Sequence, residues 1–137
     1  MRLAVSGGRY FADVPLLWRS LDELHKSTPE GIQLLVEGAS DEVTGPYKGA
    51  DYWAHQWALA RQVPCLRMRA EWEKHGRAAG PIRNGEMLKT YQLDYLLAFP
   101  GGRGTANMIE QAERAGIVFR TVHTHPASSN SRVTPND

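Results

Sequence analysis

The sequence predicts an α/β protein with a Rossmann-like three-layer fold, in which about five parallel strands carry helices on both faces. Short apolar runs alternate five times with segments of helical periodicity. Few polar residues interrupt these runs, which is typical of strands buried on both faces of a parallel sheet. Three runs end in glycine, at Gly7-Gly8, Gly38 and Gly101-Gly102. Ligands bind at the carboxyl edge of such sheets, so these glycine turns predict a site there.

The composition fits one domain without a strong charge bias. The chain has 137 residues, of which 42% are hydrophobic, and 16 basic residues stand against 15 acidic ones. The formal charge of +1 argues against nucleic acid and anionic membranes as partners, so any anion binding must be local. The single cysteine, Cys65, excludes an intramolecular disulfide and a multi-cysteine zinc site. With no leader-like or membrane-length apolar run, we expect a cytoplasmic protein.

The first half of the chain predicts two strands and two helices. Asp13 is placed to cap an amphipathic helix, and the stretch from residue 40 to 48 has no clear period and predicts a surface loop. The expected elements are a strand at 3–6, a helix at 13–27, a strand at 32–36 and a helix at 49–61.

The second half continues the alternation. A polar connection at 71–79 is the least regular stretch, and Pro81 stands where a helix is expected to begin. The expected elements are strands at 65–70, 94–99 and 116–122, and helices from about 80 to 88 and from 106 to 115.

The turn at residues 100–105 has the chemistry of a phosphate-binding loop. Gly101, Gly102 and Gly104 allow close backbone approach to an anion, and a helix that begins near Thr105 directs free N–H groups to the same place. Thr105 would cap that helix or give its hydroxyl to a phosphate, and Arg103 lies within the turn. The alternative is a tight turn between strand and helix with no ligand.

Other segments carry further candidate ligand contacts. Gly7, Gly8 and Arg9 form a second candidate anion loop. Arg83 and Asn84 fall in the first turn of their helix, where they are placed to meet a ligand, although Arg83 is equally suited to pair with a carboxylate. Arg67 and Arg69 share one face of their strand, and solvation is the favoured interpretation over anion binding.

Several motifs, in a fixed order, resemble the YspA-like branch of the SLOG superfamily over roughly residues 1 to 122. These motifs are Gly7-Gly8-Arg9, Gly49-Ala50-Asp51, Gly80-Pro81-Ile82-Arg83-Asn84 with Met87, and Pro100-Gly101-Gly102-Arg103-Gly104-Thr105. The resemblance implies a Rossmann-like domain at 1–122 that binds a nucleotide or a nucleotide-derived ligand as a sensor or processing domain. It implies no other cofactor and no metal.

Related LOG-type phosphoribohydrolases cleave the N-glycosidic bond of nucleoside 5′-monophosphates, so the resemblance also implies this activity as an alternative. Their phosphate turn corresponds to Gly101, Gly102, Gly104 and Thr105, and their arginine to Arg83. Their catalytic glutamate has no clean counterpart, because Asn107 and Met108 stand at its place and Glu110 lies further along. Asp51 or Glu37 would have to supply a carboxylate, and a carboxylate is what such cleavage requires.

LOG-type relatives are dimers, so the resemblance implies a homodimer. The apolar face with Trp53 and Trp57 is a candidate interface, and burial within the domain explains it equally well. The tryptophans are expected in the core or at an interface, and one near the glycine edge would be able to stack on a base.

Residues 123–137 form a polar C-terminal tail. His123 and His125 alternate as a metal pair would, and the segment resembles the signature of JAMM metalloproteases. The spacing to Thr134 and Asp137 departs from that signature, so a metal-dependent peptidase is a remote alternative. His25, His55 and His75 have no clear spacing and are expected to be surface or helix residues.

Overall fold

The computed structural model describes residues 1–42 and 47–124. The tail beyond Thr124, with His125, therefore lies outside the described residues. None of the helices in the described ranges is long and apolar enough to cross a membrane. The elements are β1 (Arg2–Ser6), α1 (Val14–Ser27), β2 (Leu34–Glu37), η1 (Ser40–Glu42), α2 (Gly49–Arg61), β3 (Cys65–Arg67), α3 (Trp72–His75), η2 (Gly76–Ala78), α4 (Ala79–Thr90), β4 (Tyr95–Ala98), α5 (Arg103–Ala115) and β5 (Val118–Thr121).

The five strands form one parallel sheet in the order β3-β2-β1-β4-β5. β1 pairs with β2 on one side, in register Leu3 with Leu35, and with β4 on the other, in register Ser6 with Ala98. Strand order therefore reverses between β1 and β4, which is the point where doubly wound sheets open a crevice beyond their carboxyl ends. The predicted Rossmann-like α/β fold is confirmed.

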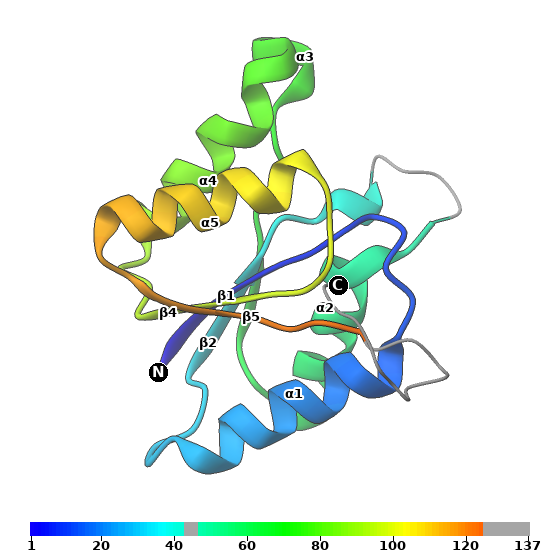
Figure 1. Ribbon diagram of the computed structural model, residues 1–137, viewed down its shortest axis with the longest axis vertical. Helices are drawn as coiled ribbons and strands as arrows, with labels where there is room; N and C mark the ends of the chain where they lie inside the picture. The colour runs from blue at the N-terminus through cyan, green and yellow to red at the C-terminus, as the bar shows by residue number, and fades with distance from the viewer. Residues whose placement is uncertain (43–46, 125–137) are drawn as a thin grey trace, which may run out of the picture.

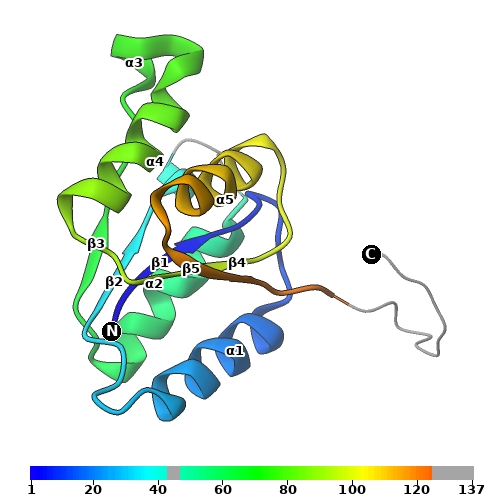
Figure 2. The same ribbon diagram turned by 60° about the vertical axis from the view of Figure 1, so that its left-hand side comes forward.

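Helices cover both faces of the sheet (Figure 1), with α1 and α2 on one side and α4 and α5 on the other. Turning the molecule shows the sheet between these two layers (Figure 2). The short helix α3 extends beyond the body of the domain, at the end of α4.

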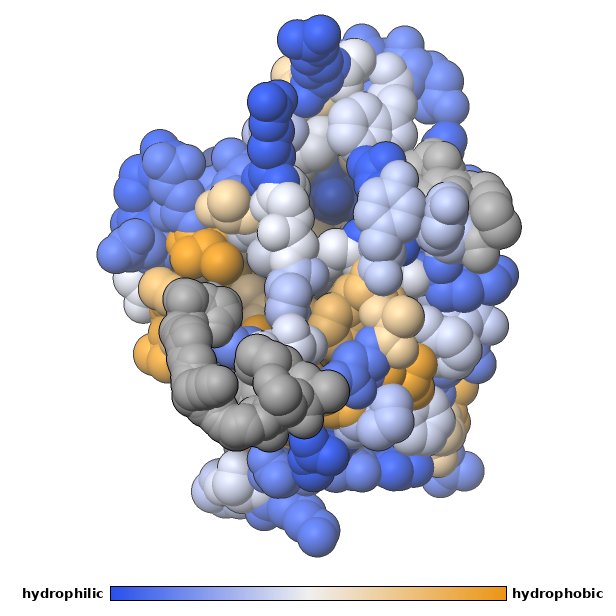
Figure 3. Space-filling model, turned by 45° about the vertical axis from the view of Figure 1, so that its right-hand side comes forward, coloured by the Kyte–Doolittle hydropathy of each residue, from blue (hydrophilic) through white to orange (hydrophobic). Residues whose placement is uncertain are grey.

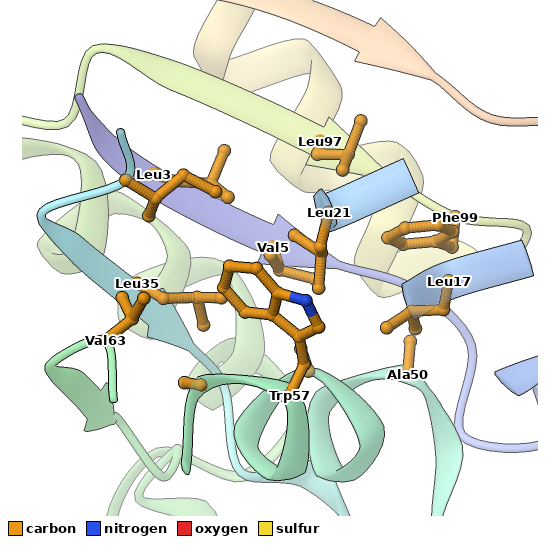
Figure 4. Close-up of a cluster of buried hydrophobic side chains, with 13 residues drawn as sticks. Leu3, Val5, Leu17, Leu21, Leu35, Ala50, Trp57, Val63, Leu97 and Phe99 are labelled. Carbon is orange, nitrogen blue, oxygen red and sulfur yellow. The ribbon is translucent and has the colours of Figure 1, made fainter. Parts of the chain in front are cut away.

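Each face has its own hydrophobic core. Under α1 and α2, the fully buried Trp57 lies among Leu17, Leu21 and Leu35 (Figure 4). Its indole N–H donates to Asp22 Oδ1 at 2.8 Å, so the ring is both packed and hydrogen-bonded. The second core joins Met87 and Met108 to β1 and β4 residues on the opposite face. Complete burial of Trp57 places it in the domain interior, and partly buried Trp53 packs against the same core.

The structure confirms the order of the elements and corrects some boundaries. Asp13 Oδ1 accepts from the backbone N–H of Leu16 at 3.2 Å, so the predicted helix cap is present. The polar connection at 71–79 contains the helical turns of α3 and η2. Helix α5 begins at Arg103, earlier than expected, so Thr105 lies inside its first turn and is not its cap.

Candidate functional site

The turns that follow β1 and β4 are joined by backbone hydrogen bonds. The N–H of Phe99 donates to Ser6 O, and the N–H of Gly8 donates to Pro100 O, both at 2.8 Å. The N–H of Ala50 donates to Gly8 O at 3.1 Å, which brings the beginning of α2 to the same place. Three segments distant in sequence therefore meet at the point where strand order reverses.

Gly101 is required by this close approach of the two turns. A Cβ there would lie 2.7 Å from Gly8 N and 3.0 Å from Gly7 C, and would also collide with the hydroxyl of Thr105. Both atoms belong to the turn directly after β1, where Gly8 is held by backbone hydrogen bonds to Pro100 and Ala50, so neither yields easily. In contrast, a Cβ at Gly102 or Gly104 would meet no described atom within 4 Å. Gly101 thus serves the packing of the turns, while Gly102 and Gly104 leave open space.

The N-terminus of α5 faces that open space. In the described structure no side chain caps this helix, and its first turn contains no acidic residue. The first N–H groups of a helix have no partner within the helix and carry its positive dipole end. Arg103, Gly104 and Thr105 supply these groups and line the adjoining cavity. This arrangement favours an anion.

The cavity has a volume of about 710 Å³, within the range of small-molecule sites. It lies at the carboxyl edge of the sheet, and Figure 3 shows the surface hollowed below the end that carries α3. The predicted residues that line it are Gly7, Gly8, Arg9, Gly38, Asp51, Arg83, Gly101, Gly102, Arg103, Gly104 and Thr105.

Arg83 reaches across from α4 to the end of β2. Its Nη1 donates to Gly38 O at 2.6 Å and to Met68 O at 3.1 Å. A Cβ at Gly38 would occupy the place of this guanidinium, so the glycine after β2 serves to seat Arg83. Burial lowers the pKa of Arg83, while the Asp51 carboxylate opposes the shift. The alternative interpretation is that Arg83 only pairs with a carboxylate. Among the described residues Arg83 forms no ion pair, and its Nη1 donates to carbonyl oxygens instead.

Among the residues predicted to contact a ligand, Asn84 does not line the cavity. It is buried behind the wall, where its Oδ1 accepts from Arg83 Nε at 3.0 Å. Its Nδ2 donates to Gly104 O at 3.2 Å and to Asn107 Oδ1 at 3.1 Å. Asn84 therefore positions Arg83 and connects α4 to the first turn of α5.

Among the described residues that line the cavity, Asp51 is the acidic one. Its Oδ2 accepts from the backbone N–H of Ser40 at 3.1 Å and from Ser40 Oγ at 2.9 Å. Only 5% of Asp51 is exposed. Burial raises the pKa of this carboxyl, and the positive charge of Arg83 opposes the rise. Asp51 is therefore a buried carboxyl at the cavity wall with an elevated proton affinity.

The other carboxylates proposed for this role lie elsewhere. Glu37 is fully buried but outside the cavity lining, and Arg67 Nε donates to it at 2.5 Å. Arg67 also pairs with Asp41, so it is a partly buried structural ion-pair partner, and the favoured prediction of solvation was wrong for it. The cause is the register of β3 beside β2, which a local pattern does not reveal. Glu110 pairs with Arg114 on the exposed side of α5.

Several lining residues were not among the predicted ligand contacts. Those with polar or aromatic side chains are Ser6, Tyr10, Phe11, Ser40, Arg69, Trp72, Arg77 and Asn107. Trp72, expected in the core or at an interface, is partly exposed and lines the cavity near the glycine turns. Arg69 pairs with Glu73 at 3.0 Å. In the described structure, Arg9, Arg77 and Arg103 have no acidic partner, which leaves three free guanidinium groups around the cavity. Clustering of cationic and aromatic residues in 69–77 is the signal that could have found this wall.

The histidines have separate roles in the described residues. His25 Nδ1 accepts from the backbone N–H of Ile32 at 2.8 Å, and His75 lies 3.8 Å from a carboxylate oxygen of Glu71. His55 lies next to Cys65 and Glu37 and is discussed below. His123 Nε2 lies 3.1 Å from the hydroxyl of Thr121, and its predicted metal partner His125 is outside the described residues.

The doubly wound sheet and the cavity at its switch point define a Rossmann-like α/β domain with a candidate ligand site at the carboxyl edge. Comparison with known families makes this specific. The model of the YspA, cpYpsA-related SLOG family, named YAcAr, matches residues 1–75, and the chain belongs to this family. The Gene 61 protein of Mycobacterium phage D29 is 37% identical over 124 residues, which covers 85% of this chain and 91% of that protein. Membership indicates a nucleotide-related binding or processing domain.

Proposed function

We propose that the chain binds a nucleotide or nucleotide-derived ligand, as a sensor or processing domain, with a phosphate at the N-terminus of α5. The observation that carries this proposal is the uncapped first turn of α5, which lines the cavity beside open space at Gly102 and Gly104. Backbone N–H groups and the helix dipole favour a dianionic phosphate at such a place. Thr105 adds a hydroxyl donor.

The remaining cavity residues favour a ligand larger than phosphate alone. Arg9, Arg77 and Arg103 have no acidic partners in the described structure, so a ligand with more than one anionic group is favoured. Tyr10 is 66% exposed and Trp72 is 37% exposed, and both line the cavity. Exposed aromatic rings at a cavity wall are suited to stack on a base.

Asp51 and Arg83 take the opposite wall in this proposal. The Asp51 carboxyl accepts a hydrogen bond from a ribose hydroxyl, and Arg83 contacts a phosphate or the ribose. Gly7 and Gly8 form the floor beside the phosphate through their backbone. We also propose that the chain forms a homodimer, and the LOG-type resemblance supports this part of the proposal.

A second candidate function is N-glycosidic cleavage of a nucleoside 5′-monophosphate, and the observation that favours it is Asp51. A buried carboxyl with a raised pKa is suited to general acid or base catalysis. Asp51 would then activate water or stabilise the oxocarbenium-like transition state. Asn107 cannot take this role, because its amide has no proton equilibrium near neutral pH and is tied to Asn84 and Gln111.

Thermal unfolding with AMP, ADP-ribose and phosphate-free adenosine tests binding. A ligand at a hundredfold excess over its Kd stabilises the fold by about 2.7 kcal/mol. We expect a shift with a phosphorylated ligand, no shift with adenosine, and loss of the shift in Arg83→Ala and Thr105→Val. Gly104→Ala is the matched control for folding. Its Cβ meets no described atom within 4 Å, so the variant should fold, while the Cβ enters the space proposed for the phosphate. Absence of a shift across a broad nucleotide panel would refute the site.

Chromatographic detection of free base separates the two candidates. Under the binding proposal, AMP stays intact at equimolar protein. Under the hydrolase alternative, adenine is released, and Asp51→Asn abolishes release while AMP still shifts the unfolding temperature. Release that persists in Asp51→Asn contradicts the catalytic role of Asp51.

A further inference from the structure

Three side chains of types that commonly ligate metals meet on the α2 face of the sheet, behind the cavity wall. Glu37 ends β2, Cys65 begins the edge strand β3, and His55 projects from α2. His55 Nδ1 lies 3.4 Å from Cys65 Sγ, and Cys65 Sγ lies 3.8 Å from Glu37 Oε2. One ligand atom from each residue lies within 4.8 Å of the others. None of the three residues lines the cavity, so this cluster is separate from the proposed nucleotide site.

The spacing of these atoms matches part of a tetrahedral zinc shell. Zinc bonds of about 2.3 Å to sulfur and about 2.0–2.2 Å to nitrogen or oxygen place neighbouring ligands about 3.4–3.6 Å apart in a tetrahedron. The observed distances of 3.4 and 3.8 Å lie within a few tenths of an ångström of these edges. The third pair, His55 and Glu37, has ligand atoms within 4.8 Å of each other, so side-chain movements of up to about an ångström would complete three corners of the tetrahedron.

The Glu37 carboxylate retains a free position for a metal. A carboxylate offers about four acceptor sites. Ala39 N donates to Oε1 at 2.7 Å, Arg67 Nη2 to Oε1 at 3.4 Å, and Arg67 Nε to Oε2 at 2.5 Å. These three donors leave one lone pair of Oε2, which faces Cys65. Metal-bound carboxylates are commonly held by such outer hydrogen bonds, so Arg67 orients the ligand.

The charge balance also favours a divalent ion. Glu37, Asp41 and Glu42 face the single cation Arg67, so the four groups have a formal charge of −2. A divalent ion that displaces the thiol proton of Cys65 adds +2 and −1, which reduces this excess negative charge to −1. Thiolate and imidazole ligands select zinc over magnesium or calcium.

We propose that Glu37, His55 and Cys65 bind a zinc ion, with water as the fourth ligand. The ion would connect α2 to β2 and β3. His55 stands one helical turn after Asp51, and Gly38 follows Glu37 directly, so the site supports the wall that carries Asp51 and seats Arg83. The role of the metal is to hold this wall in place.

Cobalt titration of the full chain after metal removal tests the proposal, because Co²⁺ reports its ligands by absorption. We expect one equivalent to bind, with a thiolate-to-cobalt charge-transfer band and the intense visible bands of tetrahedral cobalt. Zinc should displace the cobalt and raise the unfolding temperature. Cys65→Ser should abolish the charge-transfer band, and His55→Gln should weaken binding at least about tenfold. His75→Gln, outside the cluster, should bind as the wild type does.

Two results would overturn the proposal. One is the absence of a charge-transfer band in the wild type. The other is a band of unchanged affinity in His55→Gln, which would indicate nonspecific binding by the thiol. Thermal unfolding of the metal-free variants shows whether they are folded. Cys65→Ser changes a single atom, so this variant keeps the test valid if His55→Gln does not fold.

Discussion

Replacement of Gly101 by alanine tests whether the two glycine turns form one packed unit. The new Cβ would lie 2.7 Å from Gly8 N and 3.0 Å from Gly7 C. These backbone atoms follow β1 directly, and the N–H of Gly8 is already bonded to Pro100 O at 2.8 Å. The turn after β4 must therefore move away from the turn after β1, and this bond must lengthen or break.

The expected cost follows from these contacts. Overpacking at a rigid position costs about 1–3 kcal/mol. Loss of the Gly8 hydrogen bond adds about 0.5–1.5 kcal/mol. The smaller entropy of an unfolded chain with alanine offsets about 0.4–1 kcal/mol. We expect Gly101→Ala to lower the free energy of unfolding by about 0.5–4 kcal/mol in total.

Urea denaturation of Gly101→Ala and Gly104→Ala provides a matched comparison. A Cβ at Gly104 meets no described atom within 4 Å, and alanine is favoured over glycine in a helix by up to about 1 kcal/mol. Gly104→Ala should therefore equal or exceed the wild type in stability. If the two variants unfold at the same urea concentration, the contact between the turns does not constrain Gly101 and the reasoning is refuted.

Three further predictions concern the buried polar and aromatic residues. Burial raises the pKa of Asp51 above its usual 3.8, so stability from its protonated form is lost as pH rises through the folded-state pKa. Thermal unfolding from pH 4 to 8 should show a larger loss in the wild type than in Asp51→Asn, where burial of Glu37, which raises its pKa to about 7, still contributes, and parallel curves would contradict the role of Asp51. Asn84→Ala removes three hydrogen bonds of a buried side chain and should cost about 1–3 kcal/mol in urea unfolding, with a smaller cost for Gln111→Ala, which removes two hydrogen bonds at a more exposed position. Trp57→Ala should cost about 3–5 kcal/mol, and a smaller loss than for Leu17→Ala would refute its central place in the core.

Much of the fold is predictable because its signals are local. Alternating apolar runs and helical segments indicate the parallel sheet, and Asp13 indicates the beginning of α1 through a bond to the next turn. The boundaries are harder to predict, because tertiary contacts decide them. β2 extends to Glu37 since that carboxylate meets Arg67 from β3, a partner 30 residues away.

The candidate site shows the same division. Glycines at strand ends mark the cavity, because parallel strands bring their carboxyl ends to one edge. No sequence pattern reveals that Gly38 seats a guanidinium from α4, or that Asn84 stands behind the wall. Trp72 and Arg77 join the cavity through a short helix that extends from the domain, so their role depends on its placement in space.

The bond between Gly8 and Pro100 has a consequence for how this domain can diversify. The scaffold of the cavity is held by main-chain atoms, which every amino acid supplies. The side chains that line the cavity, such as Arg9, Tyr10, Trp72 and Arg77, stand on loops and on a protruding helix, and contribute little to that scaffold. Substitutions at these positions would change the shape and charge of the cavity at small cost to folding. A single architecture is thereby free to offer different cavities during evolution.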